Sequence, residues 1–272
     1  MKSKGDKMPG LVVRGEEVQV AGLNIVNYKD HPGLLLKMGE DMRLRNTRWV
    51  RGIVLHTTKG EWPQKVSEGL GPNTNVEDRI ARLWSTDHRQ AGAHLSVDWD
   101  GSIGCHCDLL LHAAYHAGAV NEYTIGIEMY QGPKPENALY EKQLDVTVKL
   151  VNELTRLFGI QRQVPNLRLT GVVPRLAAGG KDFCGVYGHR NVTTDRGRGD
   201  PGDHIFTRLL EAGYEQWDIV SGEDLAIWRQ RQAELLKVAP ASCDGIPGPQ
   251  TVDALRFVNY TDGLWVAVKE KE

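Results

Sequence analysis

Four side chains suited to metal-assisted hydrolysis stand in or directly after strand-like segments. His56 lies near the end of the β-branched run RWVRGIVLHTT, and His189 ends the short apolar run CGVYGH. Asp200 follows eleven residues later in a Gly-rich loop, and Glu128 lies in the strand-like run YTIGIEMY. His and carboxylate side chains supply the three protein ligands of a catalytic zinc ion, which keeps a fourth position open for water. If the four side chains converge, Glu128 could act as a base toward that water.

The Gly-rich loop between His189 and His204 admits two other interpretations. Its GRGDPG segment matches the G-x-G-x-x-G pattern of dinucleotide-binding loops, but such a loop normally follows a strand directly. Here the polar segment RNVTTDR intervenes, and Asp200 would bring its negative charge against the pyrophosphate. The tripeptide Arg198-Gly199-Asp200 also matches adhesive motifs, although three letters carry little specificity. The spacing favours a metal site, although each His alone is more often a hydrogen-bonded structural residue.

Composition is that of an ordinary globular protein with balanced charge. The 272 residues are 40% hydrophobic and 25% charged, with a net charge of −2. This is enough chain for one substantial domain and a small second one, without the basic excess of nucleic-acid-binding proteins. No apolar run approaches the roughly 18 residues of a membrane span, and no secretory signal is recognisable. Cys105 and Cys107 are spaced to face one side of a strand, as buried apolar residues and not as a zinc knuckle.

Strand-like and helix-like segments alternate through most of the chain. The predicted strands are at 48–58, 93–107 (a hairpin that turns at Asp100-Gly101), 123–130 and 184–189, and the predicted helices at 73–90, 138–159 and 203–213. This interleaved order is typical of an α/β protein with a mixed central sheet flanked by helices. Near the N-terminus, GLNIVNY is interpreted as an extra strand and PGLLLKMGEDMRL as a short helix or lid.

The pattern changes after Trp217. Two short helix-like segments, GEDLAIWRQRQAELLKV and GPQTVDALRFVNY, are joined by a Gly- and Pro-containing loop, which predicts a small all-α unit. We therefore expect an unassigned N-terminal extension at 1–47, an α/β domain at 48–218 and a helical domain at 219–268.

Four motifs occur in the order typical of one enzyme family. GIVLHTT, AGAHLSVDWDGSIGC, HAAYHAGAVNEYTIGIEMY and VYGHRNVTTDRGRGDPGDHIF resemble the motifs of type 2 N-acetylmuramoyl-L-alanine amidases. These zinc enzymes cleave the amide between muramic acid and L-alanine in peptidoglycan, and they share their fold with peptidoglycan-recognition proteins. The resemblance covers roughly residues 48–212, and its specificity comes from the four motifs together. It implies a zinc-dependent amidase that degrades the cell wall.

The resemblance assigns roles to individual residues. His56, His189 and Asp200 match the zinc ligands of the family. Glu128 matches the carboxylate that positions or deprotonates the attacking water. Arg198 stands where the family usually has a Lys, two residues before the Asp ligand. Because a guanidinium stays protonated at any working pH, we expect Arg198 to stabilise the oxyanion by its charge.

Two further residues match positions outside the ligand set. His116, in the HAG motif, matches a His that lines the substrate groove, and Asn121 matches an Asn for which a turn role and a substrate contact are both open. The alternative function is a non-catalytic peptidoglycan-recognition protein, since some fold relatives lack the zinc ligands. All three ligand positions hold competent side chains here, which favours the enzyme.

The C-terminal unit has a resemblance of its own. WRQRQAELLKV and the later CDGIPGPQTVDALRFVNYTDGLW are similar to a small three-helix peptidoglycan-binding domain, whose hallmark is D-G-x-x-G-P-x-T. The matching residues are Asp244, Gly245, Gly248, Pro249 and Thr251. Thr251 is suited to cap the helix predicted after it. A helical appendage that only stabilises the core is the other interpretation.

Together the two resemblances predict a monomer whose partner is bacterial peptidoglycan and not nucleic acid. Without a recognisable signal sequence, we expect synthesis in the cytoplasm and release to the wall by a holin-type route or by specialised secretion. A phage lysin and an injected effector both fit, whereas a wall-binding domain argues against a cytoplasmic recycling enzyme.

Overall fold

The computed structural model describes most of the α/β part of the chain and short pieces of the C-terminal part. The described residues are 9–46, 49–58, 80, 84, 91–130, 139–165, 184–193, 200–217, 230, 233–243, 258–261 and 264–267.

A six-stranded mixed sheet forms the centre of the described structure, in the order β11-β5-β9-β6-β7-β3. Its strands are β3 (Asn24–Asn27), β5 (Gly52–Thr57), β6 (Leu95–Val97), β7 (Ser102–Cys105), β9 (Thr124–Met129) and β11 (Gly185–Gly188). Neighbouring strands are parallel except β6 and β7, which form the antiparallel hairpin predicted around Asp100-Gly101. The prediction of a mixed sheet flanked by helices is confirmed.

The two faces of this sheet have different chemistry because side chains alternate along each strand. In β5, Ile53 and Leu55 join the main hydrophobic core, as do Ile125 and Ile127 of β9. The intervening positions of both strands, which include His56, point to the opposite face. One face therefore packs into the main hydrophobic core, and the other carries His56 beside a smaller apolar cluster that includes Val54.

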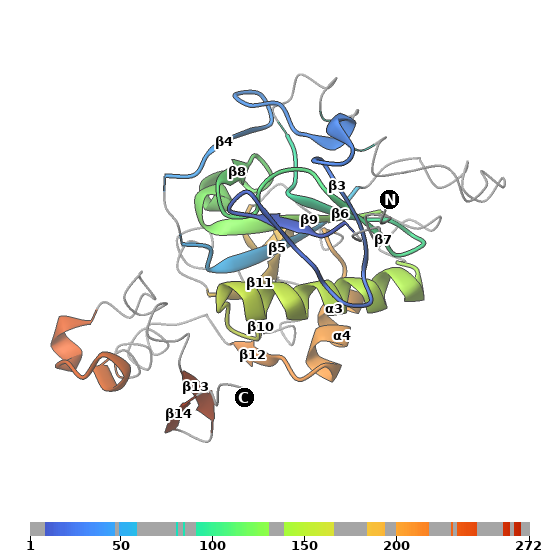
Figure 1. The fold of residues 1–272 in the computed structure, drawn as a ribbon. Coiled ribbons are helices and arrows are strands. Elements are labelled where there is room, and N and C mark those ends of the chain that lie inside the picture. The colour runs from blue at the N-terminus through green and yellow to red at the C-terminus, as the bar shows by residue number, and fades with distance from the viewer. Residues whose placement is uncertain are drawn as a thin grey trace, which may run out of the picture.

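Two helices cover the apolar face, as Figure 1 shows. Helix α3 (Glu141–Phe158) buries Leu150, Val151 and Leu154 in the main core, and α4 (Asp203–Glu211) adds Phe206. Helix α3 ends at Gly159, whose φ of 63° is the left-handed conformation that glycine adopts without strain. Both helices fall where the apolar periodicity predicts them.

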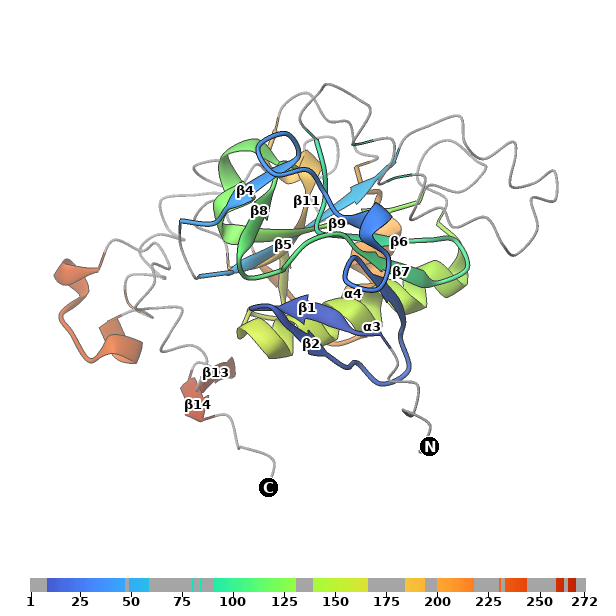
Figure 2. The same cartoon turned by 45° about the horizontal axis from the view of Figure 1, so that its top comes forward.

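The N-terminal extension is integrated into this fold. Strand β3 pairs in parallel with β7 at the sheet edge, which confirms the extra strand predicted in GLNIVNY. Hairpin β1 (Leu11–Val13) and β2 (Glu16–Val18) precedes it, and a single 3-10 turn, η1 (Pro32–Leu34), follows. Strand β4 (Met42–Leu44) then pairs with β8 (His112–Ala114), side by side in Figure 2.

Smaller elements complete the described chain. Strands β10 (Gln163–Pro165) and β12 (Glu215–Trp217) form a parallel pair, and the remaining 3-10 turns are η2 (Gly118–Tyr123), η4 (His189–Asn191) and η5 (Pro240–Ser242). Of the helix predicted at 73–90, only Ile80 and Trp84 lie within the described residues, and both are helical. Cys105 and Cys107 are buried as predicted, but they belong to two separate apolar clusters.

The C-terminal segment differs from the helical prediction at one place. Residues 258–260, predicted as the end of a helix, belong to strand β13 (Val258–Thr261), which pairs with β14 (Leu264–Ala267) in an antiparallel hairpin. The strands are rich in β-branched and aromatic residues, and Asp262-Gly263 separates them in sequence. An Asp-Gly dipeptide between such runs is a strong hairpin signal, which outweighed the helical pattern. The D-G-x-x-G-P-x-T segment lies outside the described residues.

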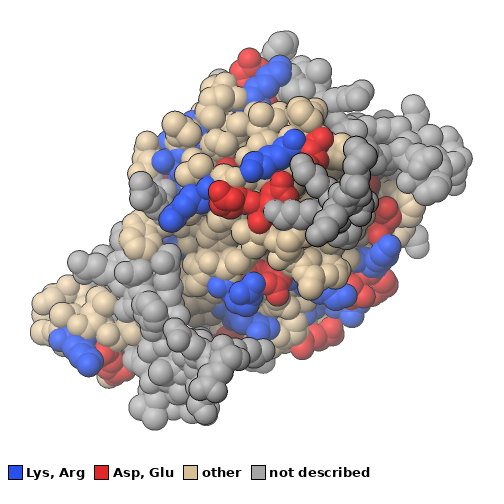
Figure 3. Space-filling model, in the orientation of Figure 1, with Lys and Arg blue, Asp and Glu red and all other residues tan. Residues whose placement is uncertain are grey.

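Charges of both signs are interspersed on the face of the molecule drawn in Figure 3. On the outer surface of the helical layer, Arg208 of α4 forms ion pairs with Glu141 and Asp145 of α3. None of the described helices combines the length and apolar character needed to cross a membrane.

Candidate metal centre

The three predicted ligands converge on the face of the sheet that lies opposite the main core. Each of His56, His189 and Asp200 offers one ligand atom, and these atoms all lie within 4.8 Å of one another. Nδ1 of His56 is 3.9 Å from Oδ1 of Asp200, and Nδ1 of His189 is 3.5 Å from Oδ2. All three side chains are buried. Residues far apart in the sequence thus form one compact donor set.

The parallel strands β5 and β11 bring the two imidazoles together. Leu55 pairs with Gly188, so the next residues, His56 and His189, stand at the same level on adjacent strands. Their ring centroids are 4.7 Å apart. Carboxyl ends of parallel strands meet at one edge of a sheet, which is why side chains there form sites in many α/β proteins.

Backbone contacts fix the loop that carries Asp200. The amide of Thr57 donates to Oδ1 of Asp200 over 3.0 Å, and the amide of Arg190 donates to the Asp200 carbonyl over 3.0 Å. Gly188 permits this close approach, because a Cβ there would lie 2.8 Å from Pro201 Cδ. Arg190 also pairs with Asp203 at 2.6 Å, tying the loop to the start of α4. Asp200 is therefore held against the end of β5.

Electrostatics keep Asp200 ionised. Burial alone would raise the pKa of its carboxyl, but the hydrogen bond from His189, electrostatic interaction with His56 and His189, and the hydrogen bond from the Thr57 amide lower that pKa to about 2. A buried carboxylate between two imidazoles is a donor set that Zn²⁺ prefers. The chemistry, burial and proximity of the three side chains fit a zinc site.

Glu128 lies beside this donor set. It is the register partner of His56 on strand β9, and it also pairs with Ser96 of β6. Laterally paired residues point to the same face of a sheet, so the Glu128 carboxylate emerges on the face that carries His56. Its side chain is half-buried. A carboxylate in this position is suited to exchange protons with a molecule bound at the centre.

His116 contacts a candidate ligand directly. Its Nδ1 is 3.0 Å from Nε2 of His56, and its Nε2 is 3.2 Å from Oγ1 of Thr124. The ring lies so close to β9 that a Cβ on Gly126 would be 2.5 Å from it. Burial lowers the pKa of His116 well below its usual value, with the neighbouring His side chains and Arg45 acting in the same direction. The structure thus places His116 next to the candidate ligand His56, on the side of the ring away from Asp200. Its predicted contact with substrate stays a prediction.

The two other predicted site residues differ in what the structure shows. Oδ1 of Asn121 accepts hydrogen bonds from the amides of His116 and Ala117, at 3.1 and 2.6 Å. This geometry supports a turn role for Asn121, since its side chain holds the segment that carries His116. Arg198 lies outside the described residues.

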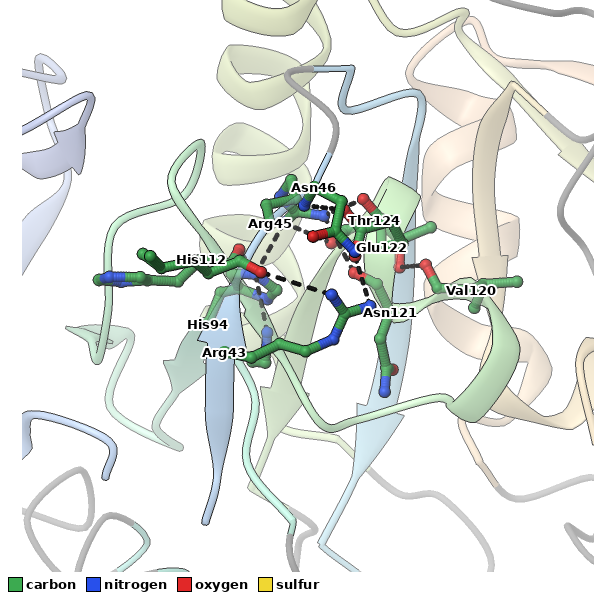
Figure 4. A network of polar contacts seen from close by, with 11 residues as sticks. Arg43, Arg45, Asn46, His94, His112, Val120, Asn121, Glu122 and Thr124 are labelled. Carbon is green, nitrogen blue, oxygen red and sulfur yellow. Dashed lines mark hydrogen bonds and ion pairs between the residues drawn. The ribbon is translucent and has the colours of Figure 1, made fainter. Parts of the chain in front are cut away.

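A polar network centred on Arg45 supports residues 121–124, the segment that follows His116 in the chain (Figure 4). Its guanidinium donates to the carbonyls of Asn121, Glu122 and Thr124, at 2.9, 2.6 and 3.0 Å. Nη2 of Arg45 also lies 3.0 Å from Nε2 of His94. Burial lowers the pKa of Arg45 to about 10. A single buried cation therefore connects the N-terminal extension to η2 and β9.

Sequence reasoning missed Arg45 and Thr124. Neither belongs to a catalytic residue pattern. Arg45 binds mainly backbone carbonyls, and because every residue has a carbonyl, the sequence does not indicate such contacts. His94 is buried, and its Nδ1 accepts a hydrogen bond of 3.0 Å from the Gly126 amide.

A mixed α/β sheet with a His, His, Asp donor set at its edge defines a protein with a candidate metal centre. The sequence profile of the N-acetylmuramoyl-L-alanine amidase family matches residues 45–203. This range is more than half of the chain, so the chain belongs to that family. It includes all of the predicted site residues. A comparison with curated proteins found no match.

Solved structures with a similar fold include both enzymes and recognition proteins. One is the endolysin N-acetylmuramoyl-L-alanine amidase LysCS from Clostridium intestinale URNW, with 17% identity, a TM-score of 0.42, and coverage of 69% of this chain and 93% of that chain. Another is Drosophila peptidoglycan recognition protein SD, with 15% identity, a TM-score of 0.48, and coverage of 73% and 99%.

Proposed function

We propose that this protein is a zinc-dependent N-acetylmuramoyl-L-alanine amidase, which hydrolyses the amide between muramic acid and L-alanine in bacterial peptidoglycan. The observation that carries the proposal is the convergence of His56, His189 and Asp200 to within 4.8 Å in a chain of the amidase family. These three residues would hold Zn²⁺, which would act as a Lewis acid and lower the pKa of a bound water toward about 7.

The protein's own residues transfer the protons and stabilise the developing negative charge. Glu128 accepts the proton of the attacking water and returns a proton to the leaving L-alanine nitrogen. Its register position beside His56 supports this role. Arg198 donates to the carbonyl oxygen as negative charge develops there. Asp200 stays ionised at working pH because its pKa is about 2, so the donor set keeps its negative charge.

The proposal extends to the C-terminal segment and to the biological setting. We propose that residues 219–268 anchor the protein to peptidoglycan, on the strength of the D-G-x-x-G-P-x-T match. The protein acts as a monomer on the wall after release from the cytoplasm. A non-catalytic recognition protein is the competing function, and it predicts wall binding without the appearance of new amino groups.

Ligand substitutions test the proposed reaction. His56→Ala, His189→Ala and Asp200→Ala should each lower bound zinc and abolish release of the L-alanine amino group from a soluble muropeptide. The exposed His31→Ala serves as a control, since that side chain lies outside the donor set. Full activity in a metal-free preparation, or in any of the three ligand variants, would contradict the mechanism.

A further inference from the structure

A chain of hydrogen bonds leads from a backbone carbonyl to a candidate zinc ligand. Oγ1 of Thr124 lies 2.8 Å from the carbonyl oxygen of Val120. The same hydroxyl lies 3.2 Å from Nε2 of His116, whose Nδ1 lies 3.0 Å from Nε2 of His56. The chain thus joins four residues through three short polar contacts.

When His116 is neutral, the hydrogen bonds of this chain can run in one direction only. A carbonyl oxygen only accepts, so the single hydroxyl proton of Thr124 is donated to Val120. The hydroxyl oxygen must then accept from Nε2–H of His116. In a neutral imidazole the other nitrogen is the acceptor, so Nδ1 of His116 accepts from Nε2–H of His56. The carbonyl of Val120 therefore determines which nitrogen of His56 carries the proton.

We propose that Thr124 and His116 are positioning residues that hold the proton of His56 on Nε2 and so present Nδ1 to the metal. This inference rests on the proposed zinc site. Nδ1 is the nitrogen of His56 that faces Asp200, at 3.9 Å. A second partner on the other ring nitrogen fixes the tautomer and the ring orientation of a metal-binding His.

The surroundings of His116 agree with this role. The ring has no room to turn away, because it packs on the bare backbone of Gly126. Asn121 holds the His116 amide, and Arg45 holds the carbonyls of the same segment.

Zinc affinity tests the proposal without reference to amidase activity. Thr124→Val removes the hydroxyl and keeps the side-chain shape, and we expect the Kd for Zn²⁺ to rise about 10–100-fold, as for other lost outer partners of a ligand. Thr124→Ser should restore most of the affinity, since it restores the hydroxyl. Competition with a chromophoric chelator measures both values.

A matched control separates lost positioning from lost stability. Thr147 on α3 is also fully buried, and its hydroxyl donates to the Gln143 carbonyl over 2.7 Å. Thr147→Val therefore deletes the same kind of hydrogen bond on the opposite face of the sheet. It should lower the Tm about as much as Thr124→Val and leave the Kd for zinc unchanged. Equal Kd values for Thr124→Val and the wild type would overturn the proposal.

Nitrogen NMR of the unsubstituted protein gives a second, independent readout. With ¹⁵N-labelled His and no metal, His56 should show a protonated Nε2 and an unprotonated Nδ1. The opposite tautomer would overturn the inference. If the tautomer and the affinity change are as expected but peptidoglycan stays intact, the proposed function fails and the positioning role stands. If peptidoglycan is cleaved and the opposite tautomer is found, only the positioning role fails.

Discussion

His56 and Glu128 are register partners on the neighbouring parallel strands β5 and β9. Their side chains consequently leave the same face of the sheet, and His56 lies beside Asp200, whose Oδ1 accepts a hydrogen bond from the Thr57 amide. The candidate ligand His56 and the carboxylate of Glu128 are therefore held relative to each other by strand pairing and not by a loop. In the proposed reaction, proton exchange by Glu128 depends on that register.

Glu128→Gln should separate metal binding from catalysis. The amide keeps the size of the side chain but cannot accept a proton, so we expect zinc to stay bound and kcat to fall by about two orders of magnitude or more. Metal content and kcat on a soluble muropeptide check this. A near wild-type rate would make Glu128 a structural residue.

Arg198 provides a test of how the oxyanion is stabilised. Arg198→Ala should lose about 10²–10³-fold in kcat while zinc stays bound, because one charged donor is removed. Arg198→Lys should keep a substantial part of the rate, since a positive charge remains. If Arg198→Ala instead lowers the Tm strongly and turns over at the wild-type rate, the side chain only braces its loop.

Truncation tests the proposed wall anchor. A chain ending at Trp217 keeps β12, the last strand of the α/β part, which pairs with β10. It should therefore cleave soluble muropeptides normally and sediment less with intact sacculi than the full chain does. Equal sedimentation of the two proteins would leave the C-terminal segment without a binding role.

Buried His106 predicts a pH dependence of stability. Burial lowers its pKa to about 4, while Nδ1 donates to the Leu34 carbonyl over 3.1 Å. Between pH 6.5 and 4 the His106 side chain is protonated in the unfolded chain but neutral in the folded chain. The free energy of unfolding therefore has its full value above pH 6.5 and decreases as the pH falls toward 4. One such group contributes a slope of about 1.4 kcal/mol per pH unit.

Urea unfolding of the metal-free protein at several pH values measures that slope. His106→Gln should make the slope shallower by about one proton. Substitution of the exposed His31 by Gln should leave it unchanged, because that side chain stays in solvent. An unchanged slope in His106→Gln would show that His106 does not titrate as its burial requires.

The sequence predicted those parts of the molecule that depend on periodicity and residue type. The β-branched run GIVLHT predicted a strand with His56 near its end, and the apolar period of α3 ended at Gly159 as expected. The candidate ligand set could be predicted because two His and an Asp occur in the order typical of the family. Convergence itself needed the parallel pairing of β5 with β11, which no local pattern encodes.

Contacts to the backbone account for most of what the sequence did not predict. Arg45 binds three carbonyls, and Thr124 connects Val120 to His116, so neither residue has a recognisable side-chain partner pattern. The strand at 258–261 was missed because an apolar helical period was preferred to the Asp-Gly turn signal that follows. Two local patterns compete there, and the turn signal prevails in residues 258–267.

Mass spectrometry of digested peptidoglycan tests the central claim most directly. Purified sacculi are incubated with the protein as prepared, after chelation, and after chelation followed by added Zn²⁺. We predict free stem peptides with L-alanine at their N-terminus in the first and third samples, intact glycan strands throughout, and no peptides in the second. Equal release of these peptides by the chelated protein, or none from the zinc-restored protein, would contradict a zinc-dependent amidase.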